Sequence, residues 1–161
     1  MGGAITLLYA LRYPEELKGI ILMGTGARPY VNPDKMERCR QPGPENSEWL
    51  ADYMESFAGV APDMHPVLSQ RAVELGPEVQ LNDLLACDGF DVMDQLGEID
   101  LPTQVFCGSE DMVTPVKYAD YLTEHMQNAR ETIIPGGSHF FQMEEYKVVN
   151  EEIENFMASL K

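Results

Sequence analysis

The chain has 161 residues, of which 44% are hydrophobic, and this length and composition suit one compact domain. Eleven Lys and Arg residues against 27 Asp and Glu give a net charge of −16, which repels phosphate backbones and anionic lipid surfaces. We therefore expect neither nucleic acid nor a membrane as a partner.

The first predicted elements are a core helix and a buried strand. Residues 3–12 carry alanine and leucine side chains at helical spacing, and Pro14 ends this run because the residue before a proline leaves helical space. Residues 17–24 form a short apolar run bounded by glycines. Such a run is typical of a strand that is covered on both faces in a parallel sheet.

The pattern changes between residues 27 and 90. Short helical stretches at 49–57 and 67–75 are interrupted by prolines at positions 29, 33, 42, 44, 62, 66 and 77. No strand pattern occurs in this part of the sequence. We predict a lid of small helices over residues 29–90, inserted between the two pieces of a core domain formed by residues 1–28 and 91–161.

Strands and helices alternate in the remainder of the chain. Residues 102–108 predict a second buried strand, and residues 130–135 predict a third. The helical periodicity of residues 116–126 and 146–160 places one helix after each of these strands. This order predicts an α/β fold with three parallel strands, right-handed crossovers and flanking helices.

The cysteines favour a reducing environment. Cys39, Cys87 and Cys107 lie far apart without a C-x-x-C pair, so neither a disulfide framework nor a zinc site is indicated. We expect a cytoplasmic protein that uses no metal and no organic cofactor. The apolar residues 2–11 are too few to span a bilayer and lack the flanking features of a signal peptide.

Two residues are candidates for catalysis because each follows a predicted parallel strand. Asp111 comes after the second strand and His139 after the third, at the edge where open α/β sheets build their sites. A carboxylate there can orient a histidine and stabilise its protonated form. On these residues alone, a helix-capping Asp111 and a packed loop His139 are equally good interpretations.

Three segments, in this order, resemble the α/β-hydrolase superfamily. The start Met1-Gly2-Gly3-Ala4 is similar to the part of the family's Ser-Met-Gly-Gly turn that follows the serine. The family's acid loop and histidine loop are matched by Gly108-Ser109-Glu110-Asp111 and Pro135-Gly136-Gly137-Ser138-His139. The resemblance covers essentially the whole chain and implies a partial α/β-hydrolase fold with a helical lid.

The resemblance also implies the roles of single residues. Asp111 would be the triad acid, His139 the general base, and Met1 the residue whose backbone N–H helps to hold the oxyanion. No Gly-x-Ser-x-Gly occurs, and that turn is lacking at each serine, namely Ser47, Ser56, Ser69, Ser109, Ser138 and Ser159. We expect the C-terminal two-thirds of a serine hydrolase of esters or related acyl substrates, truncated just after its nucleophile and inactive alone.

Other interpretations remain. The chain could be a non-catalytic remnant with a binding or structural role, or Asp111 and His139 could activate water directly and weakly. Loss of the neighbouring strand would leave an apolar strand edge exposed, so we expect a homodimer or a larger assembly. The sequence does not choose among ester, lactone, amide, haloalkane and carbon–carbon bond hydrolysis. In the lid, His65 and Trp49 are candidates either for a pocket wall or for packing.

Overall fold

The structure of the protein, a computed structural model, describes residues 1–41 and 47–160, so the prolines at positions 42 and 44 lie outside the described residues. Three strands form one parallel sheet in the order β1 (Ile20–Met23), β2 (Thr103–Gly108) and β3 (Ala129–Ile134). This sheet confirms the three predicted parallel strands and the α/β class.

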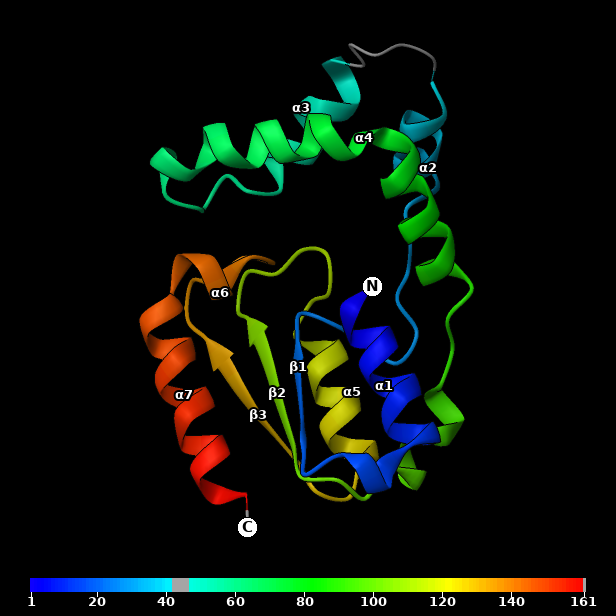
Figure 1. Cartoon of the computed structure of the whole chain (residues 1–161), viewed down its shortest axis with the longest axis vertical. Coiled ribbons are helices and arrows are strands. Elements are labelled where there is room, and N and C mark those ends of the chain that lie inside the picture. Colours follow the sequence, from blue (N-terminus) through cyan, green and yellow to red (C-terminus); the bar gives the residue numbers. More distant parts are fainter. Residues whose placement is uncertain (42–46, 161) are drawn as a thin grey trace.

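Helices cover both faces of the sheet (Figure 1). On one face, α1 (Gly2–Arg12) and α5 (Lys117–His125) pack against strand residues such as Val105, and on the other face α7 (Tyr146–Ser159) packs against Phe106. Adjacent residues of β2 contact opposite layers because side chains alternate along a strand. All six residues of β2 are buried, as expected for the central strand of a covered parallel sheet.

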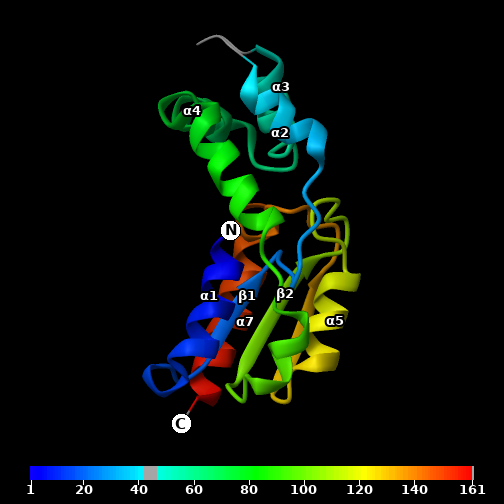
Figure 2. The same ribbon diagram turned by 90° about the vertical axis from the view of Figure 1, so that its right-hand side faces the viewer.

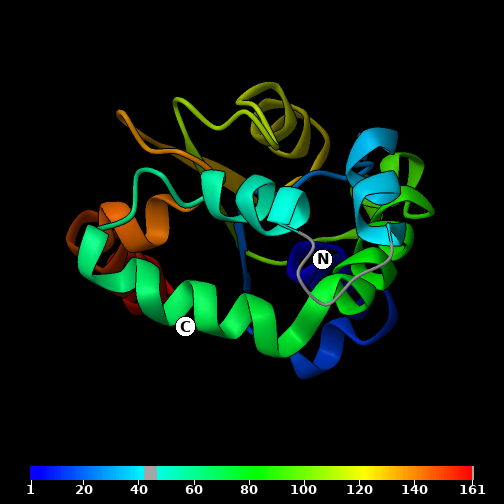
Figure 3. The same ribbon diagram turned by 90° about the horizontal axis from the view of Figure 1, so that it is seen from above.

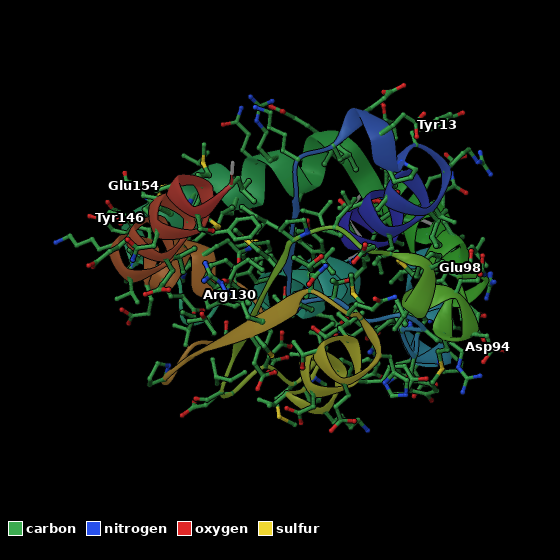
Figure 4. The ribbon with its side chains drawn as sticks, turned by 90° about the horizontal axis from the view of Figure 1, so that it is seen from below. Tyr13, Asp94, Glu98, Arg130, Tyr146 and Glu154 are labelled. Atoms are coloured by element: carbon green, nitrogen blue, oxygen red, sulfur yellow. The ribbon has the colours of Figure 1, made fainter. Side chains whose placement is uncertain are left out.

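At the end of the sheet that Figure 4 shows from below, the exposed Arg130 on β3 bonds to a buried side chain of β2. The amide oxygen of the buried Gln104 accepts a hydrogen bond of 2.6 Å from Arg130 Nε, and its nitrogen lies 3.0 Å from Thr132 Oγ1. The Arg130 guanidinium also lies 5.5 Å from the centre of the Phe156 ring on α7. A buried amide on β2 is therefore satisfied by its neighbour β3.

Beyond the opposite end, where the strands have their carboxyl ends, lies a separate group of helices (Figures 1 and 2). We call residues 29–41 and 47–90 the helical segment, which holds α2 (Pro33–Arg40), α3 (Ser47–Glu55) and α4 (His65–Asp88). Its own small core contains Cys39, Trp49 and Ala72. Seen from above, these helices cross over the end of the sheet and surround the N-terminus in projection (Figure 3).

The helical segment differs from the sequence prediction in two places. The helix predicted over 67–75 ends at Gly76, whose φ of 75° and ψ of 168° lie outside helical space, and a second helix from Pro77 to Asp88 forms the rest of α4. The predicted end after residue 75 is confirmed, since a glycine and a proline together are a typical helix end, whereas the second helix was not predicted. The helix α2 was not predicted, since its sequence is mostly charged.

Shorter elements complete the chain. The 3₁₀ helices Pro14–Glu16, Pro62–Met64 and Met93–Glu98 and the one-turn helix α6 (Phe141–Glu144) connect the larger elements. Strand β1 is shorter than the predicted 17–24, because pairing with β2 covers only the four residues from Ile20 to Met23. Among the residues that the structure describes, no helix is long and apolar enough to cross a membrane.

Candidate active site

Asp111 lies in the loop that follows β2, and both oxygens of its carboxylate accept hydrogen bonds. Its Oδ1 accepts hydrogen bonds of 2.8 Å from the backbone N–H groups of Val113 and Thr114, and its Oδ2 accepts one of 2.9 Å from Thr114 Oγ1. The side chain has no exposed surface. Burial raises the pKa of this carboxyl, but the hydrogen bond and charge of His139, together with the backbone bonds, outweigh burial and lower the pKa below its ordinary value.

His139 lies in the loop that follows β3 and meets the same carboxylate. Its Nδ1 is 2.8 Å from Asp111 Oδ2, and 27% of its side chain is exposed. Because a carboxylate only accepts hydrogen bonds, the proton of the neutral ring belongs on Nδ1 and Nε2 is left with a free electron pair. No partner of Nε2 occurs among the described residues. This geometry leaves Nε2 available to take a proton and places a carboxylate beside Nδ1 that would stabilise the protonated ring.

Backbone contacts hold the two loops together. The N–H of Ser109 donates to Ile134 O at 2.9 Å, and the N–H of Glu110 donates to Gly137 O at 2.9 Å. A Cβ at Gly108 would lie 2.1 Å from Gly137 O, so only glycine lets the loops approach this closely. The distance between the acid and the histidine is therefore fixed by main-chain packing as well as by their own hydrogen bond.

The histidine loop is also tied down on its far side. Glu144 on α6 accepts one hydrogen bond from Ser138 Oγ and a second, of 2.8 Å, from the backbone N–H of Ser138. The ring of Phe140 stacks on Phe57 of the helical segment with centroids 4.0 Å apart. The two neighbours of His139 in the chain are therefore both held in place, Ser138 by the Glu144 carboxylate and Phe140 by the ring of Phe57.

Gly24, directly after β1, is a site residue that the sequence did not reveal. Its φ is +51°, and a Cβ there would lie 3.2 Å from His139 Cε1 and 3.4 Å from Asp111 Oδ2. A side chain at this position would be strained and would press on the histidine ring. The signal in the sequence was a glycine at the carboxyl end of a strand, but its neighbours come from loops far along the chain.

The His139 ring opens on a cleft of about 440 Å³ between the sheet edge and the helical segment, a size typical of small-molecule sites. The residues that the core contributes include Met1, Ala4, Gly24, Thr25, Met112, Thr114, His139 and Phe140. The helical segment contributes Asn32, Lys35, Asp52, Tyr53, Ser56, Gln80, Leu84 and Cys87, among others. A second pocket of about 300 Å³, lined by residues such as Arg28 and Lys117, contains neither Asp111 nor His139.

The serines near the site are engaged elsewhere. Ser109 Oγ accepts a hydrogen bond of 2.8 Å from the N–H of Gly136, and Ser138 is bound by Glu144. Ser56 lines the cleft, but its hydroxyl donates to Tyr53 O at 2.5 Å. The side chain of Ser47 lies outside the described residues. None of these three described hydroxyls is hydrogen-bonded to His139.

The two candidates in the helical segment have packing roles. Trp49 is buried in the core of the helical segment, and His65 Nε2 lies 2.9 Å from Val60 O; neither lines the cleft. Met1 precedes α1 and lines the cleft, and its carbonyl accepts from the N–H of Ala4 at 2.9 Å. Across the described residues, no group of three His, Cys, Asp or Glu side chains is placed to hold a metal ion.

Comparison with known proteins finds hydrolases among the relatives of this chain. The chain is 27% identical to a 2-hydroxy-6-oxo-6-phenylhexa-2,4-dienoate hydrolase of Burkholderia cepacia and 24% identical to a pimeloyl-[acyl-carrier protein] methyl ester esterase of Neisseria meningitidis. These alignments cover 99% and 86% of this chain. The chain spans 60% of the length of the first relative and 59% of the second.

A solved structure and a family model agree with these relatives. The structure of a thermophilic esterase matches 98% of this chain and 63% of its own chain, with a TM-score of 0.86 and 28% identity. The family model described as serine aminopeptidase, S33, matches residues 1–146. This chain therefore belongs to the serine aminopeptidase (S33) family of α/β-hydrolases.

Proposed function

We propose that the chain is the part of a serine hydrolase of esters or related acyl substrates that carries the acid and the base. The observation that supports this proposal is the 2.8 Å contact between His139 Nδ1 and the buried Asp111 carboxylate, with the histidine ring lining the cleft. The nucleophile of the parent enzyme, in this proposal, is a serine that precedes Met1. The 161-residue chain alone is then inactive.

In the proposed reaction, the serine hydroxyl attacks the acyl carbon while His139 Nε2 takes the hydroxyl proton. Asp111 stabilises the imidazolium that forms, and the backbone N–H of Met1 donates to the oxyanion. His139 then gives the proton to the leaving group as the bond to the acyl carbon breaks. Water repeats the cycle, with His139 again as base, and releases the acid.

The helical segment acts in this proposal as a lid that selects the substrate. It supplies one wall of the cleft and touches the histidine loop through Phe57 and Phe140. The two named relatives are a hydrolase of a dienoate and a methyl ester esterase, which supports acyl substrates in general and no single compound.

Labelling with a fluorophosphonate probe tests the proposal, since the probe needs an activated serine. We expect no labelling of the 161-residue chain. A form extended by the upstream coding sequence of its source should be labelled, and His139→Gln should abolish that labelling. Labelling of the 161-residue chain, or labelling of the extended form that persists after His139→Gln, would contradict the assigned roles.

Exposed apolar residues favour a second candidate, a non-catalytic protein that self-associates. On α1 the side chains of Ile5 and Leu8 are 56% and 45% exposed, and β1 is an edge strand of the described sheet. Light scattering at micromolar concentration should then report a dimer or a larger species. Ile5→Glu should dissociate it, whereas Val73→Glu, at an equally exposed residue of α4, should not; a monomer would count against this candidate.

A further inference from the structure

The wall that the helical segment gives to the cleft presents hydrogen-bond donors. Lys35 on α2, Tyr53 on α3 and Gln80 on α4 all line the cleft with His139. The Trp49 ring joins the last two, because it stacks on Tyr53 with centroids 5.8 Å apart and its Nε1 donates to Gln80. Three side chains from three helices therefore converge on one wall.

The orientation of Gln80 follows from its partners. Its Oε1 accepts hydrogen bonds from Trp49 Nε1 and, at 3.4 Å, from Cys39 Sγ. An indole N–H can only donate, so the carbonyl of the amide must point toward Trp49 and the NH₂ group must point away from it. No described residue accepts from this NH₂ group. Gln80 thus has two N–H bonds left for a molecule in the cleft.

Lys35 lies one helical turn before Cys39, the residue of α2 that contacts Gln80. Residues 35 and 39 are neighbours on one face of α2, and Cys39 contacts Gln80 Oε1, so the Lys35 side chain belongs to the same wall. Lys35 is half-buried and makes no ion pair or hydrogen bond within the described part of the chain. Its nitrogen is not one of the buried atoms that lack a partner, so water can solvate it in the open cleft and an anionic group of a ligand can replace that water.

The acidic residue of this wall is already neutralised. Asp52, which also lines the cleft, lies 3.3 Å from the Arg38 guanidinium. Tyr53 adds a hydroxyl that stays protonated, since burial and the nearby Asp83 raise its pKa. In a protein with a net charge of −16, this wall is a local exception that favours an anion.

We propose that the cleft recognises a carboxylate on its substrate, bound by Lys35 with the amide NH₂ of Gln80 and the hydroxyl of Tyr53. The substrate class is then an acyl compound that carries a free carboxylate away from the bond to be hydrolysed. This inference rests on the proposed function, because that proposal places the bond to be hydrolysed at His139, on the other wall of the cleft. Charge-assisted hydrogen bonds of this kind are the strong ones in proteins.

Binding to the 161-residue chain tests this assignment without turnover. The ligands are monoethyl esters of straight dicarboxylic acids from succinic to suberic acid. Each is paired with a neutral compound of the same shape, in which a primary amide replaces the free carboxylate and the ester is kept. Titrations followed by NMR give the Kd of each ligand and show whether His139 and Thr114 signals move. We expect the best half-ester to bind about tenfold more tightly than its amide.

Three variants separate the possible outcomes. Lys35→Gln should remove the preference, Lys35→Arg should keep most of it, and Lys18→Gln, which makes the same charge change outside the cleft, should leave it intact. A preference for the carboxylate that survives Lys35→Gln overturns the inference. Equal binding of a half-ester and of its neutral amide also overturns it. Equal binding that still moves the His139 signals leaves the proposed function standing, whereas failure of every ligand to bind contradicts both.

Discussion

At the carboxyl edge of the sheet the Asp111 carboxylate accepts four hydrogen bonds, whereas the Lys35 ammonium in the helical segment has no partner among the described residues. The first wall of the cleft is held by strands, paired loops and a buried core. The second rests on a small core around Trp49 and on a helix kinked at Gly76. The wall that would carry chemistry is preorganised, and the wall that would carry recognition keeps its polar groups available.

The largest difference between the two walls should appear when a leucine is shortened to alanine in each. Leu122→Ala, at a fully buried position between α5 and the sheet, should lower the free energy of unfolding by about 3 kcal/mol. Leu84→Ala on α4, a half-buried position that lines the cleft, should cost less and act locally. Urea unfolding and hydrogen exchange measure both effects. If Leu84→Ala lowered protection in β2 as much as Leu122→Ala, the two walls would form one cooperative unit.

The charge of Asp111 should make stability depend on pH in a defined direction. Its folded pKa lies below the ordinary 3.8, so the unfolded chain binds more protons between the two values and stability is lost as the pH falls through this window. Asp111→Asn should cost about 2 kcal/mol above pH 5, and this cost should shrink as the pH falls below 3.8. Urea titrations of both proteins from pH 3 to pH 7 measure the difference. A cost that stayed constant with pH would show that packing, not charge, is lost.

A methyl group placed against the histidine should give a smaller but more specific effect. Gly24→Ala and Gly136→Ala both put alanine at a positive φ, +51° and +72°, and each should cost about 1 kcal/mol. Only the first brings a Cβ to 3.2 Å from His139, while open space surrounds the second. NMR signals of the His139 ring should therefore shift in Gly24→Ala alone. Equal shifts in both variants would mean that the loops transmit strain broadly.

The sequence predicted the sheet and its two loops because their signals are local. Residues 105–107 are apolar and lie just before a glycine, and Asp111 and His139 come shortly after the predicted strands, so chain order placed both at one edge of the sheet. Their catalytic roles remain a proposal.

The rest of the site depends on contacts that no local pattern encodes. Gly24 is needed because loops 87 and 115 residues further along reach it, and Gln80 is oriented by an indole on another helix. Gly76 and Pro77 correctly marked the end of the first helix of α4, but its second helix, from Pro77 to Asp88, was not predicted. Side-chain geometry between distant segments is the information that periodicity lacks.

The placement of the three cysteines gives the molecule an internal probe. Cys107 is buried beside the acid loop, and burial raises the pKa of its thiol to about 11; burial also raises the pKa of the Cys39 thiol. Both stay protonated at neutral pH and should react slowly with alkylating reagents. Cys87 is only partly buried and lines the cleft on the side of the helical segment. A fluorophore attached through this one sulfur would report occupancy of the cleft without any engineered residue.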